Sequence, residues 1–463
     1  MLDVMRSRYV GLPPLLKSFV APILTAVPIS IRYGGTYRSV REHALRSTLD
    51  AQFVHDWQIS RLRQILQLAC RKTGYFSQIQ AKRGADFINF NLKDLSSLPI
   101  LTKAIVSNDP QAFTIKEIGD CEVDFTSGTC GEPPMKLYLE RGRRVREIAF
   151  LHHIWSRFGY SLGDGRAILR DYAGNSPLNG KTWRYDAPLR ELWLSPFHLN
   201  NTTMDRYLEL LRLYHVRYLY GVPSAILALA RHASAQCWEP PSSLRGIISA
   251  SETLFSHQRK SIGSAFRVPV FSFYGMSERV SLAGEVVNQP DTFEFEPLYG
   301  IAELVDNSGM EITEIGKRGR LVCTGLFNKA MSLVRYDTGD RATLEQIASL
   351  ENCYRMRVSN IRSRWNQEFV VGRNNERISA INLDIGFDII SDYQYIQSRP
   401  GQVTLRAVPC YGVPQAELEK LLRNVEKRAE GVVNFQLEIV DSIPAGRTGK
   451  RKFVDQRIAG VSD

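Results

Sequence analysis

Short apolar runs alternate with helix-like segments through the middle of the 463-residue chain, and this alternation constrains the fold more than any other feature. Residues 204–215 (MDRYLELLRLYH) carry apolar side chains at the 3.6-residue spacing of a helix. The short apolar runs, each of strand length, are 217–222 (RYLYGV), 246–250 (GIISA), 268–275 (VPVFSFYG) and 320–327 (RLVCTGLF). This alternation predicts an α/β fold.

The pattern changes past residue 370, where a strand, a charged amphipathic helix and a second strand follow in close succession. These three segments are 402–408 (QVTLRAV), 414–430 (PQAELEKLLRNVEKRAE) and 434–441 (NFQLEIVD). A chain of 463 residues also exceeds what one hydrophobic core usually supports. We therefore expect a large N-terminal domain, residues 1–370, with mixed sheets flanked by helices, and a small α+β domain, residues 371–463.

Helical spacing dominates the region before about residue 95, as in ISRLRQILQLACRKTGYF within 41–83. The N-terminal stretch 11–33 is apolar, but Lys17 and four prolines interrupt it before the roughly 20 clean apolar residues that a membrane span needs. We expect no transmembrane segment and expect this stretch to pack on the N-terminal domain. A peripheral membrane contact, helped by Arg6, Arg8 and Arg32, is the alternative.

Charge and cysteine content narrow the class of protein. A net charge of +11 suits anionic partners such as nucleotides, coenzyme A, nucleic acid or an acidic membrane surface, although scattered surface charge would give the same sum. The seven cysteines include no CxxC pair and no histidine at ligand spacing. This pattern argues against a disulfide framework or a zinc site and favours a reducing, cytoplasmic compartment.

A run of hydroxyls and glycines stands at 126–138 (TSGTCGEPPMKLY), between EVDF and the alternating run MKLYL. This strand, loop, strand setting differs from a Walker A loop, which opens a helix. Gly128 and Gly131 let backbone N–H groups approach phosphate oxygens, and the loop adds hydroxyl donors. Taken alone, such a loop is more often an ordinary polar hairpin turn.

Four further stretches carry side chains suited to a nucleotide. FSFYGMSERV offers Tyr274 for stacking and Glu278 as a carboxylate that could hold Mg²⁺. RYDTGD closes on Asp340, whose two oxygens can accept both hydroxyls of a ribose. GRNNERI places Arg373 at the expected domain boundary, and IPAGRTGKRK carries Lys450 on a glycine-flexed loop. Each stretch alone is also compatible with a turn, a cap or a solvated charge.

Together and in this order, the motifs resemble the adenylate-forming ligase superfamily, and within it the phenylacetate-coenzyme A ligase-like group that includes capsular-polysaccharide-biosynthesis members. The similarity spans most of the chain, and the elements SGTxGxP and YDTGD are specific. The matching stretches are 98–103 (LPILTK), the glycine loop, 220–230 (YGVPSAILALA), 249–254 (SASETL), YGMSE, RYDTGD, GRNNER and the terminal GK.

The resemblance implies a role for each matching residue. Lys450 would bridge the substrate carboxylate and the α-phosphate of ATP, and Glu278 would bind Mg²⁺. Asp340 would bind the ribose from a surface-accessible cleft, and Arg373 would hold the nucleotide from the hinge side. The other implied nucleotide contacts are Thr126, Ser127, Gly128, Thr129 and Gly131 on the phosphates, and Ala250, Ser251, Glu252, Tyr274 and Gly275 around the adenine.

Two departures from the family pattern fall in the glycine loop. Cys130 stands where the family usually has threonine, and Pro134 stands where its commonest loop has lysine. We expect the loop to keep its function, because backbone amides carry most of a phosphate nest. No histidine and acid lie nearby in sequence to activate Cys130, which argues against a thiol nucleophile.

The implied activity is ATP-dependent conversion of a carboxylic acid to an acyl-AMP, with release of pyrophosphate, then transfer to coenzyme A after the mobile C-terminal domain has swung. Two alternatives stay open: transfer to an amine, a sugar or a carrier-protein thiol, and a binding protein on a retired ligase fold. No nucleic-acid partner is expected. Phe197, Gly221 and Met276 are pocket candidates by position, and their apolar character favours an aryl or alkyl acid.

Overall fold

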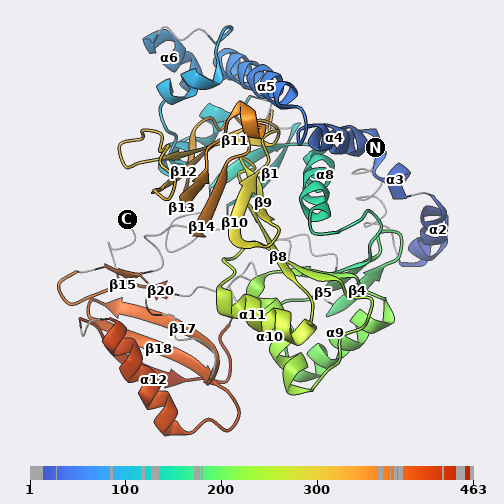
Figure 1. Cartoon of the computed structure of the whole chain (residues 1–463), viewed down its shortest axis with the longest axis vertical. Coiled ribbons are helices and arrows are strands. Elements are labelled where there is room, and N and C mark those ends of the chain that lie inside the picture. The colour runs from blue at the N-terminus through green and yellow to red at the C-terminus, as the bar shows by residue number, and fades with distance from the viewer. Residues whose placement is uncertain are drawn as a thin grey trace.

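The computed structural model shows an N-terminal body built around a large sheet and a smaller C-terminal unit beside it (Figure 1). The residues that the structure describes are 14–27, 29–83, 87–115, 120–126, 135–170, 178, 181–362, 369–375, 377–379, 383, 389–429, 432–444 and 454–458.

Helices make up most of the chain before residue 114. The longest, α5 (Ala51–Lys72), starts where the Asp50 carboxylate accepts a hydrogen bond from the Phe53 N–H at 2.8 Å, as an N-cap should. The other helices here are α2 (Pro14–Ala26), α3 (Ile29–Arg32), α4 (Gly34–Arg46), α6 (Gly74–Arg83) and α7 (Lys103–Asn108), with the 3₁₀ helices η1 (Leu92–Ser97) and η2 (Pro110–Phe113).

The large sheet has twelve strands within the described residues, in the order β11-β12-β13-β14-β10-β9-β8-β7-β6-β3-β5-β4. Strands β8, β7, β6, β3 and β5 run parallel, and the remaining strand pairs are antiparallel. The bounds are β3 (Arg166–Leu169), β4 (Trp183–Asp186), β5 (Glu191–Leu194), β6 (Tyr218–Gly221), β7 (Gly246–Ser249), β8 (Val270–Gly275), β9 (Leu282–Val286), β10 (Gln289–Phe295), β11 (Gly300–Val305), β12 (Arg318–Gly325), β13 (Tyr336–Gln346) and β14 (Arg357–Arg362). The predicted α/β fold class is confirmed.

Helices cover both faces of the parallel strands, so every residue of β3, β5, β6 and β7 is buried. Alternate residues serve opposite faces: Ala167 and Leu169 pack with α9, α10 and α11, whereas Ile168 packs with α4 and α8. The bounds of the newly named helices are α8 (Arg143–Ser156), α9 (Asn201–Leu213), α10 (Pro223–Ala235) and α11 (Ser256–Phe266).

The antiparallel half of the sheet shares a core with α5 and with the hairpin of β1 (Cys121–Phe125) and β2 (Lys136–Glu140). The segment 98–103 is tied to the start of β13 by backbone hydrogen bonds: the Leu101 N–H donates to the Arg335 carbonyl, and the Asp337 N–H donates to the Leu101 carbonyl. This anchorage fixes the strand that carries Tyr336 and Asp340.

The C-terminal unit has its own four-stranded sheet in the order β19-β18-β17-β20 and its own apolar core. The segments predicted as strand, helix and strand are β18 (Gln402–Pro409), α12 (Gln415–Arg428) and β19 (Asn434–Ile439). The other elements after residue 349 are η4 (Leu350–Asn352), β15 (Phe369–Val371), β16 (Arg377–Ser379), β17 (Ile390–Arg399) and β20 (Val454–Gln456).

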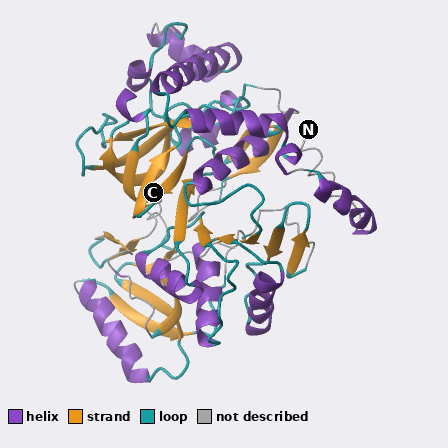
Figure 2. Cartoon of the chain, turned by 45° about the vertical axis from the view of Figure 1, so that its right-hand side comes forward, coloured by secondary structure: helices purple, strands orange, loops and turns teal. Residues whose placement is uncertain are grey.

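The first helix of the N-terminal apolar stretch, α2, does not pack on the domain as we expected, whereas Tyr33 at the end of the stretch contacts His152 of α8. Helix α2 projects from the body in both Figure 1 and Figure 2, and none of its described side chains is buried. Leu16, Phe19 and Ile23 expose 51%, 73% and 68% of their surface. The expectation failed because apolar composition indicates that a segment favours burial, but it does not indicate which surface the segment will pack against.

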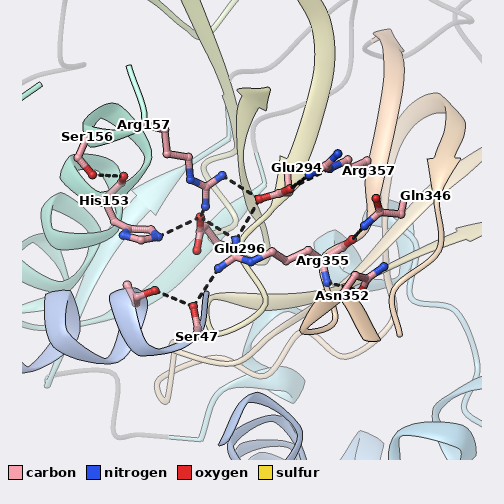
Figure 3. A network of polar contacts seen from close by, with 11 residues as sticks. Ser47, His153, Ser156, Arg157, Glu294, Glu296, Gln346, Asn352, Arg355 and Arg357 are labelled. Atoms are coloured by element: carbon pink, nitrogen blue, oxygen red, sulfur yellow. Dashed lines mark hydrogen bonds and ion pairs between the residues drawn. The ribbon is translucent and has the colours of Figure 1, made fainter. Parts of the chain in front are cut away.

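A buried ionic network joins the helices α4 and α8 to the antiparallel strands (Figure 3). The Arg157 guanidinium pairs with Glu294 at 3.2 Å and with Glu296. The Arg355 guanidinium pairs with both carboxylates at 3.2 and 3.6 Å and donates to the Ser47 hydroxyl. The network therefore neutralises two carboxylates that would otherwise be costly to bury.

His153 lies against this network, 3.8 Å from Glu296, and is only 3% exposed. Burial lowers the pKa of His153 to about 4. The Glu296 carboxylate raises this pKa, and the charges of Arg157 and Arg41 lower it. Between pH 6.5 and about 4 the unfolded chain therefore binds a proton that the folded chain does not, so this contribution to stability is lost as pH falls.

We expect His153→Leu to remove much of the acid sensitivity of folding, on the order of 3 kcal/mol between pH 7.5 and pH 4. Neither ring nitrogen of His153 has a hydrogen-bond partner among the described residues, so the variant should fold at pH 7.5. Urea unfolding at several pH values measures the difference. Parallel stability curves for variant and parent would mean that His153 titrates alike in both states.

Candidate active site

The carboxyl ends of the parallel strands bring most predicted site residues to one edge of the sheet. Gly221 ends β6, Ala250 follows β7, and Gly275 ends β8. The Ala250 N–H donates to the Gly221 carbonyl at 3.1 Å, which ties two of these ends together. Ligands of open α/β sheets bind outside this edge, so the sequence-predicted adenine segment lies where a nucleotide site is expected.

Tyr274 and Asp340 meet although they come from β8 and β13. The Tyr274 hydroxyl donates to the Asp340 carboxylate at 2.5 Å. Burial, followed by the Asp340 carboxylate, raises the pKa of Tyr274 well above its ordinary value, so the phenol stays protonated and keeps donating. The structure thus joins the residue predicted to stack on adenine to the residue predicted to bind ribose.

Asp340 itself is 6% exposed, so only a small part of its side chain is open to a ligand. The Asp340 N–H donates to the Thr338 hydroxyl at 3.0 Å, and Tyr274 covers the carboxylate. A carboxylate offers about four lone-pair sites, so the bond from Tyr274 alone does not use up its capacity to accept two ribose hydroxyls.

Glu278 lies one turn beyond the end of β8 and is 6% exposed. Its carboxylate accepts a hydrogen bond from the Tyr336 hydroxyl at 3.1 Å, so Glu278 is tied to β13, the strand that carries Asp340. No group of three or more His, Cys, Asp and Glu side chains is placed to hold a metal within the described part of the chain. Mg²⁺ often takes one or two carboxylates and completes its shell with phosphates and water, so Glu278 suits Mg²⁺ bound together with a nucleotide.

The segment after β7 is held by the helix that follows β6. The Glu252 carboxylate accepts hydrogen bonds from the backbone N–H and the hydroxyl of Ser224, at 3.0 and 3.1 Å, in the first turn of α10. A carboxylate is favourable at a helix N-terminus. Ser251 has a φ of +76°, a left-handed conformation that turns the chain sharply after the strand. Glu252 therefore positions the segment through α10, a role that its motif did not predict.

The glycine loop is closed at its base by Thr126. The Thr126 N–H donates to the Met135 carbonyl at 3.0 Å, and the Met135 N–H donates to the Thr126 hydroxyl at 2.9 Å. These bonds continue the β1–β2 hairpin, so residues 127–134 connect its strands. Ser127, Gly128, Thr129, Cys130 and Gly131 lie outside the described residues, as does Lys450.

Arg373 is placed on the C-terminal unit. Its N–H donates to the Val432 carbonyl at 3.1 Å, and its guanidinium donates to the Asn434 side chain at 2.5 Å. The side chain also lies so close to Gly401 that a Cβ there would come within 2.4 Å of it. Within the described residues these contacts keep Arg373 with the small unit, and its predicted nucleotide contact stays a prediction.

The pocket candidates lie near the same edge. Phe197 follows β5 and is 45% exposed, and Met276 packs partly buried against the core of the antiparallel half. Sequence reasoning missed Arg170, which directly follows β3 and donates to the hydroxyl of Tyr220 on β6. An arginine directly after the apolar run AIL was the available signal. Arg170 adds a cation to an edge that we had interpreted as apolar.

Gly221→Ala should destabilise the protein by about 1–3 kcal/mol. A Cβ at this position would lie 2.4 Å from the Leu169 carbonyl oxygen, a backbone atom that cannot turn away. Gly35→Ala is the matched control, since a Cβ there meets nothing within 4 Å, and it should be neutral or slightly stabilising. Chemical denaturation compares the two; equal stabilities would show that β3 and β6 can separate without cost.

Comparison with known sequences shows which proteins this chain resembles. The CapK C-terminal domain family matches residues 370–457. The Staphylococcus aureus protein CapK is 23% identical over 416 residues, which cover 87% of this chain and 89% of CapK. A phenylacetate-coenzyme A ligase from Thermus thermophilus is 22% identical over 377 residues, covering 76% of this chain and 80% of that enzyme. Over most of its length the chain is therefore similar to CapK and to phenylacetate-coenzyme A ligases.

Solved structures of the adenylate-forming fold agree. A 2-hydroxyisobutyryl-CoA ligase in the postadenylation state, in complex with R3-HIB-AMP, has a TM-score of 0.69 at 20% identity, covering 88% of this chain and 90% of that one. The same enzyme in the thioesterification state, with 2-HIB-AMP and CoA, gives 0.58 at similar coverage. Both likenesses cover nearly the whole chain and show that it shares the fold of this ligase.

Proposed function

We propose that the protein converts a carboxylic acid and ATP to an acyl-AMP and pyrophosphate, and then transfers the acyl group to coenzyme A. The observation that carries the proposal is the hydrogen bond between Tyr274 and Asp340, which brings an aromatic ring at the carboxyl end of β8 together with a carboxylate that would accept the ribose hydroxyls. Glu278, tied to the same strand through Tyr336, adds the carboxylate that would hold Mg²⁺ against the phosphates.

In the first half-reaction an oxygen of the acid attacks the α-phosphorus of ATP, and the bond to the bridging oxygen of pyrophosphate breaks. Negative charge builds on the α-phosphate and on the leaving group, so catalysis is mainly electrostatic. Mg²⁺, when bound, neutralises phosphate charge. The loop amides after Thr126 would cradle the β- and γ-phosphates, and Lys450 would lie between the substrate carboxylate and the α-phosphate.

In the second half-reaction the coenzyme A thiolate attacks the acyl carbon, and AMP leaves with the oxygen that joined it to the acid. Lys450 would serve only the first step, so the C-terminal domain would move between the steps and present another face to the acyl-AMP. The similarity to a 2-hydroxyisobutyryl-CoA ligase solved in two domain arrangements supports such a movement.

Another acceptor, such as an amine, a sugar or a carrier-protein thiol, is the second candidate. The match of residues 370–457 to the CapK C-terminal domain favours it, because this is the domain that would present the acceptor side of the site. A binding protein without activity is disfavoured, since Glu278, Asp340 and Lys450 are all present.

The acid itself should fit an edge that combines Phe197 and Met276 with the guanidinium of Arg170. An acid with an apolar body and one polar substituent satisfies both kinds of group. Purely alkyl acids carry no polar substituent that could hydrogen-bond to the Arg170 guanidinium.

A pyrophosphate-release screen tests the proposal. The purified protein is incubated with ATP, Mg²⁺ and a panel of aryl, alkyl and hydroxy acids, with and without coenzyme A, and nucleotide products are separated. We expect AMP and pyrophosphate in equal amounts with some acids, and continuous turnover only with a thiol acceptor. ADP and phosphate as products, or no ATP binding by calorimetry, would contradict it.

A further inference from the structure

The N-terminal arm, which we define as α2 and α3, exposes large apolar side chains to solvent. Leu16, Phe19 and Ile23 recur at helical spacing, so they lie on one side of α2. Ile31 of α3 exposes 58% of its surface. Large aliphatic and aromatic side chains exposed in a row are unusual on a soluble surface unless something covers them.

The charge around this face has one sign. Residues 4–41 contain no aspartate or glutamate, and their six basic residues are Arg6, Arg8, Lys17, Arg32, Arg38 and Arg41. The whole chain has an excess of eleven positive charges, so more than half of that excess falls in this N-terminal region.

The arm is joined to the body through Arg32. Its guanidinium donates to the Val27 carbonyl at 2.6 Å within the arm and to the Pro188 carbonyl in the turn after β4. Burial, together with the charge of Arg190, lowers the pKa of Arg32 from its ordinary value. Arg190 lies in the turn between β4 and β5 and is exposed, so a further positive charge lies at the base of the arm.

We propose that the N-terminal arm docks on an anionic phospholipid surface, with Leu16, Phe19 and Ile23 inserted among the acyl chains and the net positive charge of residues 4–41 attracted to the headgroups. An apolar stripe bordered by cations and free of carboxylates is the composition of an interfacial helix. A protein partner would need an acidic rim around an apolar groove, and a second copy of this arm would bring like charges together.

The arm lies on the surface rather than across the membrane. No helix in the described part of the chain combines the length and hydropathy needed to cross a bilayer. Pro22 inside α2 is compatible with a short helix lying in the interface. The consequence is that the protein would act at the membrane surface, whatever acid it uses, so this inference does not depend on the proposed function.

The test is cosedimentation of the full chain with vesicles of phosphatidylglycerol and phosphatidylcholine, compared with vesicles of phosphatidylcholine alone. We expect binding to the mixed vesicles that falls at high salt, because the charge contribution is screened. The double variant Phe19→Asp and Ile23→Asp should bind at least ten-fold less. Both side chains are exposed, so the substitutions leave the fold intact.

The matched control is the double variant Leu213→Asp and Met310→Asp. These residues are 60% and 70% exposed elsewhere on the body, so the control removes as much apolar surface and adds the same charge. It should bind like the parent. Equal loss in both variants, equal binding to both vesicle types, or no vesicle binding at all would overturn the proposal. So would a dimer, seen by analytical ultracentrifugation without lipid, that the arm variant dissociates.

Discussion

Lys450→Ala should lose acid-dependent ATP–pyrophosphate exchange by about a hundred- to a thousand-fold, the scale for one lost preorganised donor. The proposed role of Lys450 places its charge where the attacking carboxylate and the α-phosphate share a growing negative charge. Transfer of the acyl group from added, preformed acyl-AMP to the acceptor should change much less, because that step uses the other domain arrangement.

Arg447→Ala, three residues earlier in the sequence, is the control for general charge. If Lys450 were one more cation in a basic tail, both variants would cause small, salt-sensitive losses in both half-reactions. The two half-reactions have to be measured separately, since a coupled assay reports only the slower one. Mild losses of equal size would remove Lys450 from the reaction and weaken the domain movement with it.

Asp340→Ala should weaken ATP binding by about a hundred-fold, since hydrogen bonds to a charged group contribute about 1.5–3 kcal/mol each. The same change leaves the Tyr274 hydroxyl without its acceptor, which should cost about 1–3 kcal/mol of stability. Calorimetric titration with ATP and urea unfolding separate the two effects.

The double variant Asp340→Ala and Tyr274→Phe distinguishes binding from folding. Removing both partners of the hydrogen bond should restore most of the lost stability, because no donor is left unpaired. ATP affinity should stay low, since the ribose acceptor is still missing. Recovery of ATP affinity together with stability would mean that Asp340 only holds Tyr274 in place.

The apolar runs predicted the strands well, because a strand buried on both faces is a short unbroken apolar run. They could not predict the partner of each strand. The run 320–327 has the same character as 217–222, yet it forms part of β12 in the antiparallel half, whereas the other contains β6 in the parallel half. Strand direction depends on which partner lies alongside, and a single run of residues does not contain that information.

In the candidate site, too, the motifs identified single residues but not the contacts between them. The motifs identified Tyr274 and Asp340 as separate candidates, but their hydrogen bond joins residues 66 positions apart and is set by the sheet order. The motif containing Glu252 gave no hint that its carboxylate caps α10, since the capped residue lies 28 positions earlier. Arg170 was missed because no motif contains it.

The proposed activity depends on formation of an acyl-AMP, and isotope transfer tests that step most directly. An acid that is active in the pyrophosphate screen is labelled with ¹⁸O in both carboxyl oxygens and incubated with ATP, Mg²⁺ and coenzyme A, and the AMP is analysed by mass spectrometry. We expect one labelled oxygen in each AMP formed, because the acid oxygen that attacks phosphorus leaves with the nucleotide. Unlabelled AMP, or label recovered in inorganic phosphate, would contradict adenylation of the acid.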